Sequence, residues 1–413
     1  MTDSLFFDEL ETRSRAEREQ ALFAALPAQV TNAQQNAPAF ADILNGVDAS
    51  AITSREALAQ LPVTRKSALT ALQKQNPPFG GLTAKAAPQM RRIFSSPGPI
   101  YEPEARRVDY WRMARALYAA GFREGDIVHN SLSYHLTPGG WIFDDAAQAL
   151  GCAVFPAGVG QTELQVTSIV DVQSTGYMGT PSFLKIMLDK AADMQVSLSS
   201  LKKAFVSGEA LLPAVRQQIN DAGISICQGY ATADLGLIAY ETSAGEGLVI
   251  DEGVIVEIVR PGTGDPVAEG EVGEVVVTTL NPEYPLIRFA TGDLSAVLAG
   301  ESPCGRTNMR IKGWMGRADQ TTKVKGMFVH PEQIAEVIKR HTEIQNARLI
   351  VAHEGVNDIM TLRCEVANSD DSLADTIKNT VREVCKLRSD VEFVTPKSLP
   401  NDGKVIDDVR KFD

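Results

Sequence analysis

Short apolar stretches alternate with amphipathic stretches through the middle of the chain. The apolar stretches predict strands at 126–132, 153–157, 176–178, 204–207 and 224–228. The amphipathic stretches predict helices at 105–121, 141–150, 162–171, 182–194 and 213–222. Short strands that alternate with helices are typical of βαβ units, whose sheets are mostly parallel. The middle of the chain therefore predicts an α/β fold.

The pattern changes toward the N-terminus and again after Leu248. At the N-terminus, a rough helical period with charges opposite predicts helices at 8–25 and 28–45, and Thr64 could cap a further helix at 65–72. After Leu248, short strands punctuated by glycines predict a small antiparallel β subdomain. Its strands are expected at 249–251, 254–259, 274–279 and near 296.

Beyond Gly316 the predicted order is strand, helix, two strands, helix and strand, with the helices at 331–340 and 371–387. Such an order makes a small α+β layer that can fold by itself. We therefore expect a large α/β N-terminal domain over residues 1–316, with mostly parallel sheets plus the small β subdomain. A small α+β C-terminal domain is expected over residues 317–413.

Composition favours a soluble globular protein and narrows the classes of partner. Hydrophobic residues make up 44% of the chain and charged residues 22%, which argues against wholesale disorder. The net charge of −12 argues against a nucleic-acid partner, because binding phosphates needs a basic face. No apolar run approaches the roughly 18–20 residues of a membrane span, and the N-terminus is too polar for a signal peptide. Five scattered cysteines without a C-x-x-C pair favour reduced thiols and a cytoplasmic location.

Three segments carry residues that could do chemistry. Asp293 follows an apolar strand and Gly292, and a carboxylate there suits hydrogen bonds to a ribose diol, although such a sequence is often only a turn. Arg317 and Asp319 lie at the predicted domain junction, where they could contact a charged ligand and act as a hinge, or form a surface turn. Lys404 lies in a glycine-containing tail loop and could swing toward a developing negative charge, or stay solvated.

The three segments together, in this order and spacing, resemble the adenylate-forming superfamily, which includes acyl-CoA synthetases. The tail is similar to that superfamily's proline-to-Gly-Lys element, here Pro400 to Lys404. Stretches at 155–158, 179–182 and 207–209 are similar to the phenylacetate–CoA ligase branch. The resemblance extends from about Leu61 to Lys404. It implies that the carboxylate of an acid attacks the α-phosphate of ATP, and that the thiol of CoA then displaces AMP after the C-terminal domain rotates.

The resemblance implies a role for each residue that matches a family motif. Asp293 would hold the ribose hydroxyls, and Arg317 would contact the ribose or the phosphates. Lys404 would bridge the carboxylate and the α-phosphate, and Asp319 would be the hinge of a mobile C-terminal domain. The remaining nucleotide contacts would be Ser95, Ser96, Ser207, Gly208, Glu209, Tyr230, Ala231 and Thr232.

Two motifs depart from the family pattern. In the adenine motif, Tyr230 would stack on the base and Asp234 would replace a Mg²⁺-binding glutamate, while Ala233 stands where the family has a threonine. In the phosphate loop, which covers Ser95 to Pro103, Glu102 takes the position of the family lysine and two prolines remove N–H donors. Either pyrophosphate is positioned differently here, or the protein is a weak or altered ligase.

A structural zinc site, which many relatives in this branch carry, is not expected. Glu241 and Val249 stand at two of its ligand positions, and Cys304 is the one ligand that remains. One thiolate cannot hold a structural Zn²⁺, which needs four ligands.

The pocket for the acid is expected around Tyr134, Ala157 and Gly158, which suit a flat aromatic acid such as phenylacetate. His135 could orient the carboxylate or pack beside Tyr134. The leading hypothesis is therefore an AMP-forming acid–CoA ligase that uses ATP, Mg²⁺ and CoA. Two alternatives stay open: an adenylating enzyme with another acceptor, and a nucleotide-binding protein with weakened catalysis. The resemblance also leaves a homodimer open.

Overall fold

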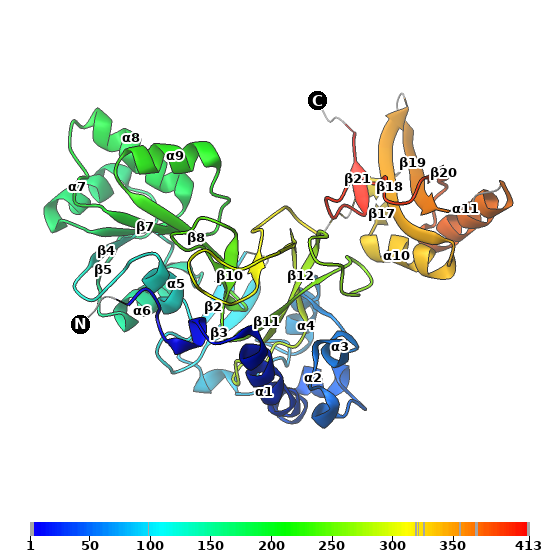
Figure 1. The fold of residues 1–413 in the computed structure, drawn as a ribbon, viewed down its shortest axis with the longest axis horizontal. Helices are drawn as coiled ribbons and strands as arrows, with labels where there is room; N and C mark the ends of the chain where they lie inside the picture. The colour runs from blue at the N-terminus through cyan, green and yellow to red at the C-terminus, as the bar shows by residue number, and fades with distance from the viewer. Residues whose placement is uncertain are drawn as a thin grey trace. The chain divides into compact units, whose positions relative to one another are not determined.

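Figure 1 shows the fold of the chain in a computed structural model. The structure describes residues 4–97, 99–318, 320, 322–324, 327–354, 357–367 and 371–410. Two compact units divide the chain, and each takes more than one stretch of it. The first unit comprises Met1–Val256, Val277–Phe289 and Leu298–Trp314. The second comprises Glu257–Val276, Ala290–Val297 and Met315–Asp413.

The first unit is built on a sheet that has nine strands among the described residues, in the order β14-β15-β10-β9-β8-β7-β6-β4-β5. Neighbouring strands from β5 to β8 run parallel, whereas β9, β10 and β15 join antiparallel. The predicted βαβ alternation and the mostly parallel sheet are therefore confirmed. The strands are β4 (Ile127–Asn130), β5 (Ala153–Pro156), β6 (Gly176–Gly179), β7 (Lys203–Val206), β8 (Ser225–Thr232), β9 (Gly236–Tyr240), β10 (Leu248–Ile250), β14 (Val297–Leu298) and β15 (Arg310–Ile311).

Helices cover both faces of this sheet, because successive residues of a strand point to opposite sides. Met178, Phe205 and Cys227 of three neighbouring strands share one hydrophobic cluster with α5 (Ala114–Ala119) and α6 (Gly139–Ala149). The residues next to them in sequence, Tyr177, Ala204 and Ile226, share another cluster with α7 (Thr162–Val172), α8 (Pro181–Asp193) and α9 (Pro213–Asp221). Figure 1 shows the two groups of helices on opposite sides of the strands.

Two predictions within this region are wrong. The helix expected at 105–121 is reduced to α5, because Asp109 and Arg112 adopt left-handed backbone angles, with φ of 48° and 63°, that a helix cannot contain. The Asp109 carboxylate instead accepts a hydrogen bond from the Ala114 amide at 3.1 Å. The strand expected at 249–251 does not belong to the small β subdomain, because β10 pairs with β9 and β15 of the large sheet.

The N-terminal region differs from the sequence prediction in two respects. The helix expected at 65–72 with Thr64 as its cap begins later, because Thr64 and Arg65 form a strand and the α-helix starts at Leu69. In place of the helices expected at 8–25 and 28–45, one long helix, α1 (Arg15–Asn36), continues through Pro27 and is followed by a short helix at 38–43. Buried Leu22, Leu26 and Val30 form one apolar stripe on both sides of the proline, which holds the helix together across it. The other elements before the large sheet are η1 (Glu9–Glu11), α2 (Pro38–Ile43), η2 (Ala49–Ala51), α3 (Arg55–Ala59), β1 (Thr64–Arg65), η3 (Lys66–Ala68), α4 (Leu69–Gln75), η4 (Ala87–Gln89), β2 (Arg92–Ser96) and β3 (Ile100–Glu104).

A four-stranded sheet with the order β1-β13-β12-β11 contains the strands predicted at 254–259 and 274–279. Its long strands are β11 (Val254–Val259), β12 (Gly273–Thr279) and β13 (Phe289–Ser295). Each of these three strands has residues in both compact units.

The C-terminal part of the second unit has the α+β order that the sequence predicts. The strands of its main sheet follow the order β20-β19-β18-β21, and helices α10 and α11 pack on the shared hydrophobic core. Its elements are β16 (Thr322–Val324), β17 (Met327–Val329), α10 (Pro331–Arg340), β18 (Ile344–Glu354), β19 (Asn357–Val366), α11 (Asp371–Cys385), β20 (Asp390–Val394) and β21 (Ile406–Asp408). Within the described ranges of both units, no helix is long and apolar enough to cross a bilayer.

Close packing at β6 generates the first prediction. A Cβ at Gly176 would lie 2.6 Å from the ring of Phe122, which is fully buried in the core. Gly176→Ala should therefore lower the free energy of unfolding by about 1–3 kcal/mol, measured by urea denaturation. Gly139→Ala is the matched control, since its nearest contact would be an ordinary 3.9 Å and it begins α6. Equal stability of the two variants would contradict this account of the core.

Candidate functional site

Several predicted nucleotide contacts meet where neighbouring parallel strands end. Ser207 follows β7, and Tyr230 lies near the end of β8. The Ser207 amide donates to the Gly179 carbonyl after β6 at 3.1 Å, and its hydroxyl donates to the Gly229 carbonyl at 2.9 Å. These bonds hold three loop starts together at the carboxyl edge of the sheet, where α/β folds bind ligands.

The loop after β7 and the end of β8 carry the other residues predicted to contact the nucleotide in this region. Gly208 takes a left-handed φ of 81°, and Glu209 after it is exposed. The register of β8 shifts between Tyr230 and Ala231, and such a bulge re-aims side chains near a site. Half-buried Tyr230, Ala231 and Thr232 are thus presented at the strand end, where Thr232 also accepts a hydrogen bond from the Leu235 amide.

The predicted phosphate loop is a hairpin of β2 and β3. Ser95 and Ser96 end its first strand, and Gly98 at the turn lies outside the described residues. Glu102, on the second strand, is fully buried and turns back toward Ser96. It accepts a hydrogen bond from the Ser96 amide at 3.2 Å and another from the Ser96 hydroxyl. The carboxylate therefore occupies the donors that a phosphate would use.

Asp234 lies in the turn between β8 and β9, and its side chain is fully buried. One of its oxygens, Oδ2, is 2.5 Å from the Nζ of Lys66. The other, Oδ1, has no hydrogen-bond partner among the described residues. A buried carboxylate oxygen without a partner is costly unless something binds it, and a hard cation such as Mg²⁺ fits. The sequence placed Lys66 only in a helix, so this contact was missed.

The ionisation of Glu102 depends on its burial and on the charge of Asp234. The pKa of Glu102 is raised to about 8, first by burial and then by the charge of Asp234. The hydroxyl of Tyr284 is also buried without a hydrogen-bond partner among the described residues. Burial and then the two carboxylates hold the pKa of Tyr284 well above its usual value. The described structure thus joins the Asp234 turn to half-buried Lys66 by an ion pair, and the charges of Asp234 and Glu102 both act on Tyr284.

The predicted acid pocket has a rigid wall. The Tyr134 hydroxyl donates to Asp144 at 2.7 Å and accepts from the Asn130 amide at 2.8 Å, so it is engaged within the protein. The Tyr134 ring meets Trp141 edge-on, with the ring centres 5.2 Å apart.

The other predicted acid contacts are less enclosed. His135 is exposed, and the carbonyl of Leu136 after it accepts a hydrogen bond from the Ser95 amide at 2.9 Å. This bond connects the acid region to the phosphate-loop hairpin. Gly158 has a φ of 69°, and a Cβ there would meet no atom within 4 Å. Ala157 beside it is half-buried.

In the second unit, Asp293 and Arg317 form an ion pair. Arg317 Nη1 lies 2.8 Å from Asp293 Oδ1, and the two residues also form an isolated β-bridge. Gly292 suits this position because its φ of 77° lies in the left-handed region that favours glycine. The structure therefore brings together two residues that are 24 positions apart in the sequence. Asp319, the predicted hinge, lies outside the described residues.

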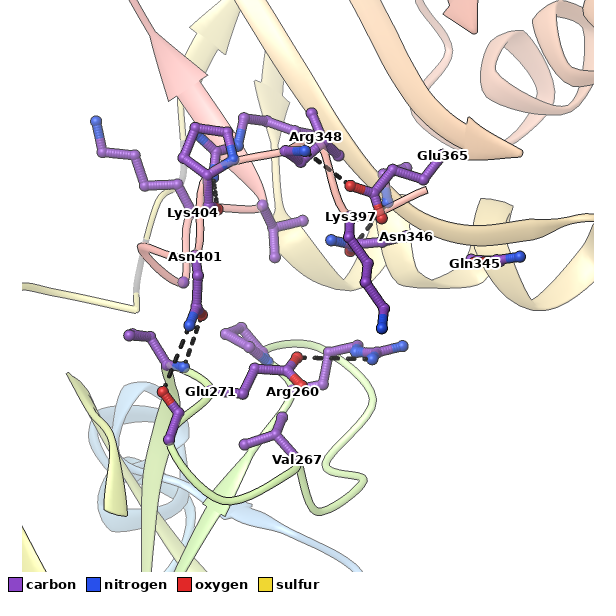
Figure 2. A pocket seen from close by; sticks show the side chains of 18 of the residues that line it. Arg260, Val267, Glu271, Gln345, Asn346, Arg348, Glu365, Lys397, Asn401 and Lys404 are labelled. Atoms are coloured by element: carbon purple, nitrogen blue, oxygen red, sulfur yellow. Dashed lines mark hydrogen bonds and ion pairs between the residues drawn. The ribbon is translucent and has the colours of Figure 1, made fainter. Parts of the chain in front are cut away.

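Lys404 lies on a loop that is firmly held within the second unit. The Gln320 side chain donates to the Gly403 carbonyl at 3.0 Å and accepts from the amides of Val405 and Ile406 at 2.5 and 2.8 Å. Asn401 accepts a hydrogen bond from the Val272 amide at 3.0 Å, as Figure 2 shows. The side chain of Lys404 is half exposed and forms an ion pair with Asp407 at 2.8 Å.

Two cavities open beside this loop. The larger, of about 610 Å³, is drawn in Figure 2, and its basic side chains are Arg260, Arg348, Lys397 and Lys404. The smaller, of about 350 Å³, is lined by both Arg317 and Lys404. The structure therefore places the predicted tail lysine and the predicted junction arginine at one cavity.

Glu241, where the family resemblance implies a zinc ligand, pairs instead with Arg216. The guanidinium donates to both carboxylate oxygens at 2.9 Å and to the Ile226 carbonyl at 3.1 Å. Glu241 also accepts from the Gln228 amide at 3.1 Å. An ion pair thus ties α9 to β8 and to the end of β9. Within the described residues, no group of three or more His, Cys, Asp or Glu could hold a metal ion.

Two family models match the chain. Residues 146–281 match the model described as AMP-binding enzyme, and residues 326–409 match the AMP-binding enzyme C-terminal domain. A phenylacetate-coenzyme A ligase of Thermus thermophilus is 30% identical over 383 residues, which cover 88% of this chain and 84% of that protein. The phenylacetate-coenzyme A ligase of Escherichia coli is 28% identical, with 96% of this chain and 95% of that protein covered.

Solved structures of a 2-hydroxyisobutyryl-CoA ligase are also similar. Its open conformation in complex with 2-HIB-AMP and CoA has a TM-score of 0.74 at 25% identity, covering 97% of this chain and 93% of that one. The same enzyme in its thioesterification state has a TM-score of 0.73 at 25% identity, covering 100% and 94%.

The pairing of Arg216 with Glu241 generates the second prediction. Arg216→Ala leaves the nearly buried Glu241 carboxylate without its cation, so the free energy of unfolding should fall by roughly 1–3 kcal/mol. Urea denaturation measures the change. Lys185→Ala, which breaks an exposed pair with Asp189, should cost only about 0.5 kcal/mol or less. A loss for Arg216→Ala no larger than that of the control would exclude this role.

Proposed function

The chain belongs to the adenylate-forming AMP-binding enzyme family, in the branch of the phenylacetate–CoA ligases, and we propose that it joins an aromatic carboxylic acid to CoA at the expense of ATP. The observation that carries the proposal is the carboxyl edge of the large sheet, where the Ser207 hydroxyl bonds to the Gly229 carbonyl beside Tyr230, on the strand that leads to Asp234. Strand ends held together in this way suit the adenosine and phosphates of an acyl-adenylate.

The proposed reaction has two halves. In the first, a carboxylate oxygen of the acid bonds to the α-phosphorus of ATP, the bond to the β-phosphate breaks, and pyrophosphate leaves. In the second, the sulfur of CoA bonds to the acyl carbon, the carbon–oxygen bond to AMP breaks, and the thiol proton is lost to solvent. Phosphoryl transfer needs positioning and charge neutralisation more than covalent help from the protein.

The residues of the second unit would supply part of that charge. Asp293 would accept hydrogen bonds from the ribose hydroxyls, and Arg317, already paired with it, would contact the ribose or the phosphates. Lys404 would lie against the carboxylate and the α-phosphate during the first half-reaction. Its ion pair with Asp407 must open for that contact, so Asp407 would hold the lysine away from the reacting atoms between turnovers.

The residues of the first unit would hold the nucleotide and the acid. Tyr230 would stack on adenine, and the Tyr134 ring with the open surface at Gly158 would receive a flat acid. Asp234 would hold Mg²⁺ through its unpartnered oxygen, and that ion, when bound, neutralises phosphate charge. A cytoplasmic location and a homodimer, both expected from the sequence, stay predictions.

The third prediction tests the proposed activity itself. The purified chain should catalyse exchange of pyrophosphate into ATP in the presence of an aromatic acid such as phenylacetate, and should form acyl-CoA and AMP when CoA is added. Exchange is measured with labelled pyrophosphate and acyl-CoA by mass spectrometry. AMP binding without exchange for any acid in a panel would instead indicate a nucleotide-binding protein. Exchange without acyl-CoA would indicate another acceptor.

The fourth prediction separates the two half-reactions. Lys404→Ala should slow adenylation by about a hundredfold or more, because a cation beside the developing charge is lost. Thioester formation from a supplied acyl-adenylate should stay close to the wild-type rate. Lys378→Ala on α11, with the same change of charge in the same unit, is the control. Equal slowing of both halves by Lys404→Ala would refute the role given to Lys404.

A further inference from the structure

The loop between β5 and α7 carries part of the predicted acid pocket, yet it is not anchored by burial. It comprises residues 157–161, each of which is half-buried or exposed. Gly158, Gly160 and Gln161 adopt left-handed backbone angles, with φ of 69°, 77° and 49°. Residues other than glycine adopt that region at a cost, so Gln161 in particular needs support from its surroundings. The shape of the loop must therefore be held by residues outside it.

A buried glutamine of α7 supplies that support. Gln165 is 4% exposed, and its side-chain nitrogen donates to the Gly158 carbonyl at 2.8 Å and to the Gly160 carbonyl at 2.7 Å. A glutamine side chain has two N–H donors, so both are used on the loop. From the other side, the Gly158 amide donates to the carbonyl of Asn130, the last residue of β4, at 3.0 Å. The loop is thus fixed between α7 and the end of β4.

A buried histidine sets the orientation of this glutamine. The side-chain oxygen of Gln165 lies 2.8 Å from Nε2 of His129, which is fully buried on β4. Because the amide oxygen can only accept, the ring donates from Nε2. Burial lowers the pKa of His129, which keeps the ring neutral. The ring also stacks on Phe155 of β5, with the ring centres 5.3 Å apart. A reversed amide would lose these bonds and turn its oxygen toward the two loop carbonyls.

The same contacts extend to the other residue that is expected to receive the acid. Asn130 is fully buried beside His129 in β4, and its side chain donates to the Tyr134 hydroxyl at 2.8 Å. Its carbonyl is the group that accepts from the Gly158 amide. Tyr134 and Gly158 are therefore both bonded to Asn130, so movement of the loop away from Asn130 would change its distance from Tyr134.

We propose that Gln165 is a positioning residue for the acid, because it holds the loop at 157–161 in the shape that receives the acid, and that His129 keeps its amide turned toward the loop. The part that this loop takes in acid binding rests on the proposed function. Gln165 acts through its two N–H donors, which a carboxylate in the same place cannot supply. The selection of the acid thus depends on a buried residue of α7 that needs no contact with it.

The fifth prediction replaces this amide by a carboxylate of the same shape. Gln165→Glu can still accept from His129, but it offers no N–H to the carbonyls of Gly158 and Gly160. The KM for the aromatic acid in pyrophosphate exchange should rise by about tenfold or more, because two carbonyls lose their donors. The KM for ATP should stay close to the wild-type value. Gln20→Glu makes the same change at an exposed position of α1 and should leave both constants unchanged.

A folding defect would give a different result, because it lowers the active fraction and leaves both KM values unchanged. A lower rate of Gln165→Glu without a higher KM for the acid, or equal rises for the acid and for ATP, would overturn the proposal. His129→Phe keeps an aromatic ring beside Phe155 but cannot donate to the glutamine, so a smaller rise in the KM for the acid is expected. An unchanged KM in His129→Phe would refute the role given to His129.

Direct binding of the acid separates this proposal from the proposed function. Isothermal titration calorimetry with phenylacetate and the other acids of the panel, with AMP present, measures binding without turnover. Gln165→Glu should weaken that binding by about tenfold, for the same loss of two donors. Such weakening in a chain without pyrophosphate exchange would refute the ligase function and leave the role of Gln165 intact. Equal affinities of Gln165→Glu and the wild-type chain, or no binding of any acid by the wild-type chain, would overturn the proposal.

Discussion

The burial of the central parallel strands on both faces is the constraint on which the rest of the first unit depends. Tyr177, Ala204 and Ile226 point to one helical layer, and Met178, Phe205 and Cys227 point to the other. Because neither face is free to receive a ligand, the polar residues of these segments gather at the carboxyl edge. The bonds of Ser207 to Gly179 and Gly229 hold that edge together, so the position of each loop follows from the packing of the strands beneath it.

Several buried carboxylates of the first unit are kept charged or hydrogen-bonded by partners from distant segments of the chain. The ion pair of Arg216 with Glu241 links helix α9 to strand β8 and to the residue that follows β9. In the hairpin, Glu102 takes the donors of Ser96, and Lys66 takes one oxygen of Asp234. The two carboxylates differ in how many of their oxygens are hydrogen-bonded. Both oxygens of Glu241 accept a hydrogen bond, whereas Asp234 retains a buried oxygen without a partner among the described residues. A carboxylate whose oxygens are all bonded contributes to the structure, whereas one with an unbonded buried oxygen is a candidate binding site.

The tail lysine of the second unit depends on the residues that fix its backbone. Gln320 bonds to the backbone on both sides of Lys404, and Arg348 pairs with Asp402 and donates to the Pro400 carbonyl. The backbone is therefore held, while the side chain can exchange Asp407 for another anion at little cost, because the pair is half exposed. Such an arrangement suits a lysine that must act in one half of a reaction and withdraw in the other.

Local patterns in the sequence were sufficient for much of the fold and for part of the site. Strand and helix alternation predicted the parallel sheet, and the order after Gly316 predicted the C-terminal layer, because both follow from periods of burial along one segment. The motif order also brought Asp293, Arg317 and Lys404 into one hypothesis, and the structure places Arg317 beside both of the others. The places where helices break were predicted wrongly in both directions. Helix α1 continues through Pro27, whereas the left-handed backbone angles of Asp109 and Arg112 shorten the helix expected at 105–121 to α5.

Only the tertiary structure decided which charges face each other. Lys66 and Asp234 are 168 positions apart in the sequence, and no periodic pattern along the chain predicts their ion pair. The sequence pattern also does not predict the ion pair of Arg216 with Glu241, or the pairing of strand β10 with β9. A sequence specifies burial along each segment through side-chain chemistry, whereas ionisation and pairing depend on distances between segments. The chain by itself thus determined its family resemblance and its layers, and the three-dimensional contacts determined how its altered phosphate loop is charged.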